Sequence, residues 1–173
     1  MSHSIHVLGF VAAHRNMGKT TLIEKLIQHM QTQGIRVSVI KHTHHDIEID
    51  KPGKDSYRFR AAGAGQVLIS SSHRWALITE TNNNDDPSLE SLIDKLQNQN
   101  TDIIFFEGFK SAAFPKIEVY RESDADMLYL EDSNIIGIAT DDISRCRDID
   151  IPIFDLIAID RIAEFIMHRF QLR

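Results

Sequence analysis

One short segment, residues 13–20 (AHRNMGKT), limits the folds open to this chain. An apolar run over 5–12 precedes it and an amphipathic run over 21–27 follows it, so the sequence predicts a strand, a loop and a helix in that order. This is the context of a phosphate-binding P-loop, whose pattern G-x-x-x-x-G-K-[ST] ends here in Gly-Lys-Thr. In such a loop the backbone N–H groups and the N-terminus of the following helix converge on phosphate oxygens.

The residues of this segment have separate expected roles. Ala13 replaces the first glycine of the pattern, which is acceptable if position 13 keeps a negative φ. Asn16 lies in mid-loop, and Asn tolerates the left-handed region better than most residues. We expect Lys19 to neutralise the β- and γ-phosphates and the Thr20 hydroxyl to hold Mg²⁺. The alternative is a glycine-containing turn with a chance Lys-Thr pair.

Patterns further along the chain predict an α/β fold. The helix after the loop is expected to end near Gln33, with Gly34 as its stop, before a second strand over 35–40. A strand, a crossover helix and a strand imply parallel pairing. The other predicted elements are helices over 55–62, 88–99 and 159–170, and strands over 66–70, 75–79, 103–106, 116–121, 134–139 and 151–154.

Two of these predictions shape the topology. Strands 66–70 and 75–79 are joined by a short turn and predict an antiparallel hairpin, so we expect a mixed, mostly parallel sheet flanked by helices. The run over 116–121 alternates between apolar and polar residues, which predicts a half-exposed strand. We expect a single P-loop nucleotide-binding domain over 1–173.

A second informative stretch, residues 41–56, follows the strand predicted over 35–40. Ligands of open α/β sheets bind beyond such strand ends. The stretch holds three His, four acidic residues and three Lys. One hypothesis is a switch-like loop that touches Mg²⁺, the γ-phosphate or a second anion. A rival is a transition-metal site, with His42, His44, His45 and Asp46 as possible ligands. The third possibility is a solvated polar loop.

The third informative stretch ends a predicted strand with the acidic residue Glu107. Glu107 follows four apolar residues that predict a fully buried strand, and Gly108 comes next. A P-loop protein needs an acid at this place to hold Mg²⁺ or its water. Buried strands often end in an acid without such a role, but the P-loop in the same chain favours the functional interpretation.

Composition excludes several other classes. The formal net charge of −6 argues against broad binding to nucleic acid or to anionic membranes. Cys146 is the sole cysteine, which rules out an internal disulfide and fits a reducing, cytoplasmic setting. No apolar run reaches the ~18 residues that a membrane span needs. The first strand starts so near the N-terminus that we expect no signal peptide.

The sequence resembles the molybdopterin-guanine dinucleotide biosynthesis protein B (MobB) family over nearly its whole length. The resemblance rests on the P-loop ending in Gly-Lys-Thr-Thr, on the segments over 41–46 and 50–56, on Glu-Gly-Phe-Lys over 107–110, and on 75–77 and 79–81. The Lys-His-Thr-His-His-Asp segment is distinctive, whereas a P-loop alone indicates nucleotide binding. The resemblance implies GTP binding, a low intrinsic GTPase activity, a homodimer, and an adapter role beside the guanylyltransferase that attaches GMP to molybdopterin.

The motifs and the resemblance together give a set of candidate residues. Candidates for holding the nucleotide are Asn16, Met17, Gly18, Lys19, Thr20, Thr21 and Asp141; candidates for Mg²⁺ are Thr20, Asp46 and Glu107; the catalytic candidates are Lys19 and Glu107; and the candidates for a second anionic ligand, such as the phosphate of molybdopterin, are His42, His44, Lys51 and Lys54.

Asp141 is the candidate for reading the base. The chain has no Asn-Lys-x-Asp guanine motif, and Thr140-Asp141-Asp142 follows a predicted buried strand at the ligand-binding edge. A carboxylate can accept two parallel hydrogen bonds, which guanine offers at N1 and the 2-amino group. Asp141 is chosen over Asp142 because it lies closer to the strand end. The alternative is an Asp that caps a turn or helix.

Two other functions fit parts of the sequence. A small-molecule P-loop kinase usually needs an Arg-bearing lid over the phosphates, and no Arg-rich insertion is present. A GTP-driven metal chaperone is suggested by the His cluster over 42–45. Stoichiometric, tight binding in a nickel or zinc titration would favour the chaperone over the adapter.

Overall fold

The computed structural model describes residues 5–43, 49–81, 87–97, 100–121 and 126–173. The chain forms two compact units. The first, which we call the sheet unit, comprises Met1–His42 and Leu89–Arg173, and the second, the hairpin unit, comprises Thr43–Ser88. The expectation of a single nucleotide-binding domain over 1–173 stays a prediction. The predicted P-loop belongs to the sheet unit.

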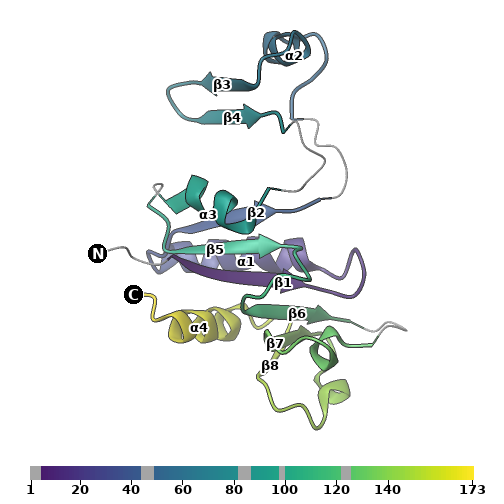
Figure 1. Ribbon diagram of the computed structural model, residues 1–173. Helices are drawn as coiled ribbons and strands as arrows, with labels where there is room; N and C mark the ends of the chain where they lie inside the picture. Colours follow the sequence, from purple (N-terminus) through teal and green to yellow (C-terminus); the bar gives the residue numbers. More distant parts are fainter. Residues whose placement is uncertain (1–4, 44–48, 82–86, 98–99, 122–125) are drawn as a thin grey trace. The chain divides into compact units, whose positions relative to one another are not determined.

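Six strands of the sheet unit pair in parallel, in the order β2-β5-β1-β6-β7-β8. Their bounds are β1 His6–Val11, β2 Val37–Lys41, β5 Ile103–Glu107, β6 Lys116–Tyr120, β7 Ile135–Thr140 and β8 Ile153–Asp155. The carboxyl ends of parallel strands lie at one edge of the sheet, where α/β proteins bind their ligands. Figure 1 shows β1, β5 and β6 side by side with their arrowheads toward this edge. The segments after these strands therefore start close together.

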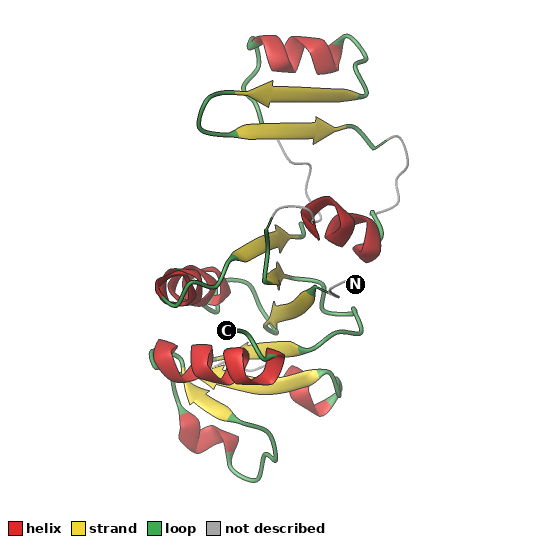
Figure 2. Cartoon of the chain, turned by 90° about the vertical axis from the view of Figure 1, so that its left-hand side faces the viewer, coloured by secondary structure: helices red, strands yellow, loops and turns green. Residues whose placement is uncertain are grey.

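Helices cover both faces of this sheet (Figure 2). The helices α1 (Lys19–Thr32) and α4 (Ile159–Phe170) share one apolar core with the sheet, whereas α3 (Leu89–Gln97) packs on the other face against Ile104 and Phe106. Two short 3₁₀ helices, η1 (Leu128–Leu130) and η2 (Ile143–Cys146), lie near the ends of β6 and β7. The predicted α/β fold, with helices on a parallel sheet, is confirmed.

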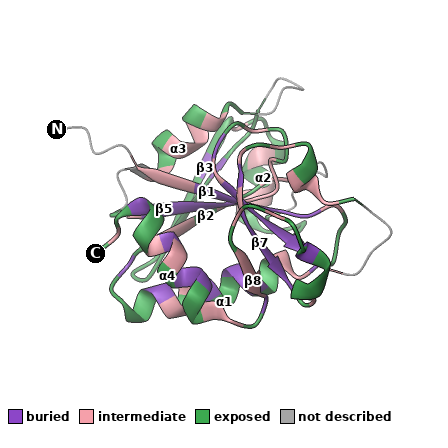
Figure 3. Cartoon of the chain, turned by 90° about the horizontal axis from the view of Figure 1, so that it is seen from below, coloured by how far each residue is buried: buried purple, intermediate pink, exposed green. Residues whose placement is uncertain are grey.

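The helix α1 illustrates why this fold forms. Its buried residues are Leu22, Ile23, Leu26 and Met30, a spacing that places them on one face of a helix. Gly34 ends the helical segment with a φ of 80°, a conformation that glycine adopts at little cost. Figure 3 shows buried residues, in purple, along β5 and β7, which lie between the helical layers. The loop over residues 12–18 is therefore anchored between a buried strand and a packed helix.

The hairpin unit contains the helix α2 (Asp55–Ala61) and the strands β3 (Gln66–Ser70) and β4 (Trp75–Thr79). The strands pair antiparallel, with Gln66 opposite Thr79, which confirms the predicted hairpin. They form a two-stranded sheet of their own, so the antiparallel pairing lies outside the six-stranded sheet. Arg60 of α2 pairs with both Asp50 and Glu80, each at 2.8 Å, and thereby fastens the helix within the unit.

The prediction of a half-exposed strand over 116–121 was wrong, because every residue of β6 is buried. β6 lies between β1 and β7, and its polar side chains find partners inside the protein. Lys116 Nζ donates to the carbonyl oxygens of Lys110 (2.8 Å) and Ala112 (2.7 Å) and ion-pairs with Asp132 at 2.5 Å. A buried ammonium is tolerable only with such partners.

Glu118 is the other polar residue of β6, and it is fully buried. Its carboxylate accepts hydrogen bonds from the backbone N–H groups of Leu128 (2.8 Å) and Tyr129 (2.9 Å). Burial raises the pKa of the Glu118 carboxyl, and the two backbone bonds oppose that rise. The alternating pattern therefore reflects internal pairing of polar groups.

None of the helices in the described part of the chain has the length and apolar character that a membrane span requires.

Candidate functional site

The loop between β1 and α1 has the backbone of an anion-binding loop. Asn16 has a φ of 63° and Gly18 a φ of 94°, both left-handed, while Ala13 is not among the described residues with positive φ. The backbone conformations expected of Ala13 and Asn16 are confirmed, whereas contact of Asn16 with a nucleotide stays a prediction. Left-handed residues within such a loop turn successive N–H groups toward a common point.

The first turn of α1 is open to an anion. Gly18 is its N-cap, no side chain caps the turn, and no acidic residue lies within it. The N–H groups at the start of a helix carry a partial positive charge, so an uncapped N-terminus attracts an anion. Met17 is buried in the core and anchors the loop, whereas Thr21 is exposed on the first turn. Met17 can therefore offer a ligand only its backbone.

Two lysines bond to the start of the loop. Lys19 Nζ donates to the carbonyl oxygen of His14 at 3.3 Å, and Lys110 Nζ donates to that of Ala13 at 2.8 Å. Burial lowers the pKa of the Lys19 ammonium; the charge of Glu107 opposes this, while Lys110 and Lys41 add to it. A half-buried ammonium beside other cations gains stability from an anion, and phosphate supplies one.

Thr20 and Glu107 meet at the centre of the site. The Thr20 hydroxyl donates to Glu107 Oε1 at 2.9 Å, and Lys41 Nζ lies 3.3 Å from Oε2. Glu107 reaches this place because β5 pairs with β1, so that the ends of the two strands are neighbours. The backbone turns sharply after it at Gly108, whose φ is 101°.

The pair of Thr20 and Glu107 fits a magnesium ion. A hydroxyl and a carboxylate are oxygen ligands of the kind Mg²⁺ takes, and Mg²⁺ usually binds through one or two protein groups with water and phosphate completing its shell. The third magnesium candidate, Asp46, lies outside the described residues.

Asp141 and Asp142, both after β7, have different partners. Asp142 caps η2: its carboxylate accepts from the Ser144 N–H at 3.0 Å and from Arg145 Nε at 3.1 Å. Asp141 is half-exposed and lies 3.5 Å from Arg121 Nε. Asp142 therefore has the capping role that was the alternative for Asp141, and Asp141 instead pairs with Arg121.

Arg121 is a residue of this edge that the sequence analysis did not identify. It follows β6 and lies against Gly18. Its place after a parallel strand was the available signal, the same signal that pointed to Asp141. Lys41 and Lys110 belong to the motifs over 41–46 and 107–110, and the structure places their ammonium groups beside Glu107 and the carbonyl oxygen of Ala13.

The stretch over 41–56 is described in part. His42, directly after β2, packs against Phe109 with the two rings tilted and their centroids 4.8 Å apart. His44, His45 and Asp46 lie outside the described residues, so the transition-metal hypothesis stays a prediction. Among the residues described, no three His, Cys, Asp or Glu side chains gather as a metal site would require. Lys51 and Lys54 belong to the hairpin unit and are exposed.

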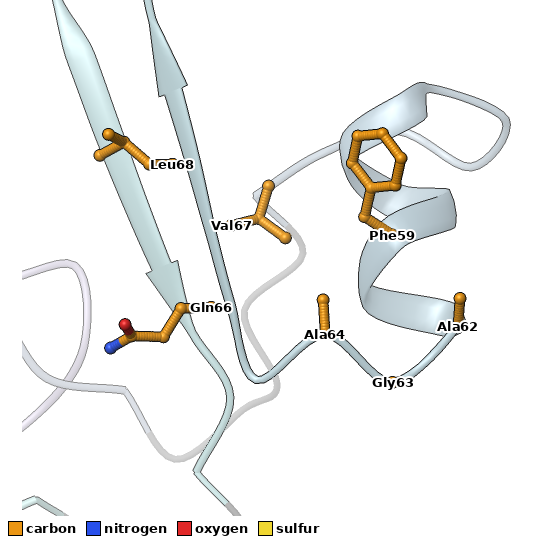
Figure 4. A pocket seen from close by; sticks show the side chains of 7 residues that line it. All are labelled: Phe59, Ala62, Gly63, Ala64, Gln66, Val67 and Leu68. Carbon is orange, nitrogen blue, oxygen red and sulfur yellow. The ribbon is translucent and has the colours of Figure 1, made fainter.

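The hairpin unit presents apolar side chains to solvent. Leu68, Leu77 and Trp75 share one face of the β3–β4 sheet and are 62%, 46% and 57% exposed. The buried Val67 and Ile78 lie on the opposite face. Figure 4 shows Val67 directed toward Phe59 of α2, at an open hollow of about 580 Å³, with Leu68 on the other side of β3.

Comparison with known proteins assigns the family. A family model described as Molybdopterin guanine dinucleotide synthesis protein B (MobB) matches residues 7–141. The chain belongs to the MobB family. Its relatives include the molybdopterin-guanine dinucleotide biosynthesis adapter proteins of Escherichia coli K12, 38% identical over 96% of this chain and 94% of the relative, and of Haemophilus influenzae, 39% identical over 99% and 94%.

Solved MobB structures share the fold. The crystal structure of Bacillus subtilis MobB matches with a TM-score of 0.72 and 27% identity, over 92% of this chain and 97% of that one. A crystal structure of molybdopterin-guanine biosynthesis protein B (mobB) matches with a TM-score of 0.75 over 95% and 99%, at 24% identity. The resemblance of the sequence to the MobB family is therefore confirmed, and so is the α/β fold predicted from its strands and helices.

Proposed function

We propose that this MobB-family chain is a GTP-binding adapter in molybdopterin guanine dinucleotide formation, working in the cytoplasm beside the guanylyltransferase that attaches GMP to molybdopterin. The observation that carries the nucleotide part is the hydrogen bond between Thr20 and Glu107 at the uncapped start of α1. A hydroxyl and a carboxylate at a helix N-terminus bring magnesium ligands and phosphate donors together. The adapter part follows from the names of the curated relatives.

The same groups support weak, magnesium-dependent GTP hydrolysis. The backbone N–H groups and Lys19 would hold the phosphates, and Thr20 with Glu107 would hold Mg²⁺ or its water. Phosphoryl transfer is catalysed chiefly by positioning and by charge stabilisation, and this site supplies both. Molybdopterin is the candidate second ligand, since it carries a phosphate that Lys51 or Lys54 would attract.

Glu107→Gln is expected to lower magnesium-dependent GTP hydrolysis more than GTP binding. The substitution keeps the shape of the side chain but removes the charge that fixes Mg²⁺ or its water, and this charge matters most as negative charge moves in the transition state. The kcat of GTP hydrolysis and the Kd of GTP should be measured in parallel.

Glu107→Gln removes both the charge of Glu107 and its ion pair with Lys41, and the variant Lys41→Gln, which removes the ion pair alone, distinguishes the two effects. Lys41 neutralises Glu107 from the side opposite Thr20 and is itself largely exposed. We expect Lys41→Gln to change kcat less than Glu107→Gln does. An unchanged kcat in Glu107→Gln, together with a lowered melting temperature, would make Glu107 a structural strand-end acid.

We also propose a homodimer formed through the hairpin unit. Leu68, Leu77 and Trp75 form an exposed apolar face, and Phe59 and Val67 line the hollow on the other side of β3 together with the polar Gln66. A two-stranded sheet also has unpaired edges that can pair with another chain. Exposed apolar patches of this kind commonly mark an interface.

Light scattering at micromolar concentration is expected to give the mass of a dimer. Leu77→Asp places a charge at the centre of this face and should shift the mass toward that of a monomer, because burial of an unpaired charge is costly. Thr79→Asp, on the same strand and face near its end, is the matched control and should disturb the dimer less. A monomer mass for the unmodified protein would contradict the proposal.

Copurification tests the adapter role itself. We expect the tagged chain, isolated from cells that make the dinucleotide, to carry the guanylyltransferase and guanine nucleotide with it. The Lys19→Ala variant should lose the nucleotide. Recovery of the unmodified chain without the guanylyltransferase, under conditions in which that enzyme is abundant, would contradict an adapter role.

A further inference from the structure

Arg121 is a cation of the phosphate loop that no motif identifies. It follows β6, which pairs in parallel with β1, so it leaves the sheet beside the strand that leads into the loop. Its guanidinium lies against Gly18: a Cβ built on Gly18 would be 3.6 Å from Cζ and Nη2 of Arg121 and 3.8 Å from Nε. Gly18 caps α1. The guanidinium therefore sits beside the positive end of that helix.

The polar contacts of this guanidinium are incomplete. Nε lies 3.5 Å from Asp141 Oδ2, is shielded from solvent and has no hydrogen-bond partner. The side chain as a whole is 43% exposed, so a ligand can reach it. A cation beside a helix N-terminus that has no capping side chain and no acidic residue in its first turn is unfavourable, and an anion that touched both would relieve the repulsion.

The candidate magnesium ligands and the pair of Arg121 and Asp141 lie on opposite sides of β1. Thr20 and Glu107 lie on the β5 side of β1, whereas Arg121 and Asp141 follow β6 and β7 on the other side. P-loop proteins hold Mg²⁺ beside the β- and γ-phosphates, so a nucleotide bound with Mg²⁺ at Thr20 and Glu107 would have those phosphates toward Glu107. Its base would then point toward the ends of β6 and β7. Its α-phosphate, which joins the nucleoside to the other phosphates, would lie between these positions, near Gly18.

We propose that Arg121 binds the α-phosphate of the nucleotide, with Asp141 holding its Nε side in place. This inference rests on the proposed GTP site and adds a specific contact to it. The planar guanidinium fork matches two phosphate oxygens at once, which an ammonium does not. Because GDP and GTP share the α-phosphate, Arg121 contributes equally to the binding of both.

Calorimetric titrations of GTP and GDP test this contact. Arg121→Gln is expected to weaken both nucleotides by a similar factor of about tenfold or more, as for loss of hydrogen bonds to a charged group. Arg121→Lys should give an intermediate loss, because it keeps the charge and loses the fork. Arg145→Gln is the matched control: Arg145 pairs with the neighbouring Asp142 at a similar exposure, and its loss should leave both affinities unchanged.

The possible outcomes separate this contact from the proposed function. Unchanged GTP and GDP affinities in Arg121→Gln, with Lys19→Ala still unable to bind, would overturn the role of Arg121 and leave the GTP site in place. A loss for GTP alone would move Arg121 to the γ-phosphate and overturn the α-phosphate contact. No GTP binding by the unmodified chain would contradict the proposed function itself. If Arg121→Gln does not fold, unchanged affinities in Arg121→Lys overturn the proposal and weakened affinities for both nucleotides support it.

Discussion

Replacing Lys19 with Ala is expected to abolish GTP binding while the fold stays intact. Lys19 Nζ bonds only weakly to the loop carbonyl of His14, at 3.3 Å, and its ammonium is half-buried beside Lys110 and Lys41. Burial lowers the pKa of Lys19, so in the free protein its charge is a cost and not a stabilising contact. The β- and γ-phosphates would supply the missing counter-charge.

The expected loss exceeds about a hundredfold in affinity, because hydrogen bonds to charged groups are each worth about 1.5–3 kcal/mol and Lys19 would make more than one. Lys25→Ala is the matched control, since Lys25 is an exposed lysine of the same helix. Calorimetry gives the affinities and circular dichroism checks the fold. An unchanged GTP affinity in a normally folded Lys19→Ala protein would remove the phosphates from this loop.

Asp141→Asn is expected to reverse the base preference. The carboxylate would accept from guanine N1 and the 2-amino group, and Asn places a donor where only acceptors stood. GTP should weaken by roughly 2–3 kcal/mol as a polar pair is mismatched. Xanthosine triphosphate has a carbonyl in place of the 2-amino group and should bind the variant better than it binds the parent.

Because Asp141 also pairs with Arg121, a loss of GTP affinity alone would not show that Asp141 contacts the base. The affinity for xanthosine triphosphate separates the two effects. Asp141→Asn also removes the charge 3.5 Å from Arg121 Nε, and that effect should change both nucleotides alike. Only recognition of the base changes them in opposite directions. Asp142→Asn is the control: it removes the charge that pairs with Arg145, keeps an amide oxygen that can still cap η2, and should leave the base preference unchanged. If both nucleotides bind Asp141→Asn as they bind the parent, Asp141 does not contact the base.

The free energy of unfolding at acidic pH depends in part on Asp142, whose carboxylate caps η2. Hydrogen bonds from Ser144, and then the pairing with Arg145, hold the pKa of the Asp142 carboxyl below its usual value. A depressed folded-state pKa contributes stability that is present above the unfolded pKa and is lost as pH falls through the folded pKa. This contribution belongs to the cap of η2.

Local patterns of the sequence predicted most elements of the fold. The helix over 159–170 and the hairpin strands over 66–70 and 75–79 have the predicted bounds, because apolar spacing and turn residues determine such segments over a few residues. The left-handed backbone of Asn16 was predictable from the tolerance of Asn for that conformation. The meeting of Thr20 with Glu107 follows from the placement of a strand-end acid beside the loop.

Local sequence patterns could not predict contacts between segments that are distant in the sequence. Lys116 and Glu118 made β6 look half-exposed, but their partners are Asp132 and the backbone of residues 110, 112, 128 and 129. An alternating pattern shows which residues are polar. It does not show which groups pair with them, and such pairing decides whether a polar residue can lie inside the protein. Arg121 was overlooked for a related reason, since its neighbours Gly18 and Asp141 come from two other strand ends.

The most direct test of a GTP site at this edge of the sheet is a calorimetric titration of GTP into the purified, nucleotide-free chain in the presence of Mg²⁺, with ATP titrated in parallel. We expect saturable binding of one GTP per chain, much weaker binding of ATP, and no GTP binding by the Lys19→Ala variant. A folded protein that binds no GTP, or that binds GTP equally well with Lys19→Ala, would contradict a GTP site at this edge.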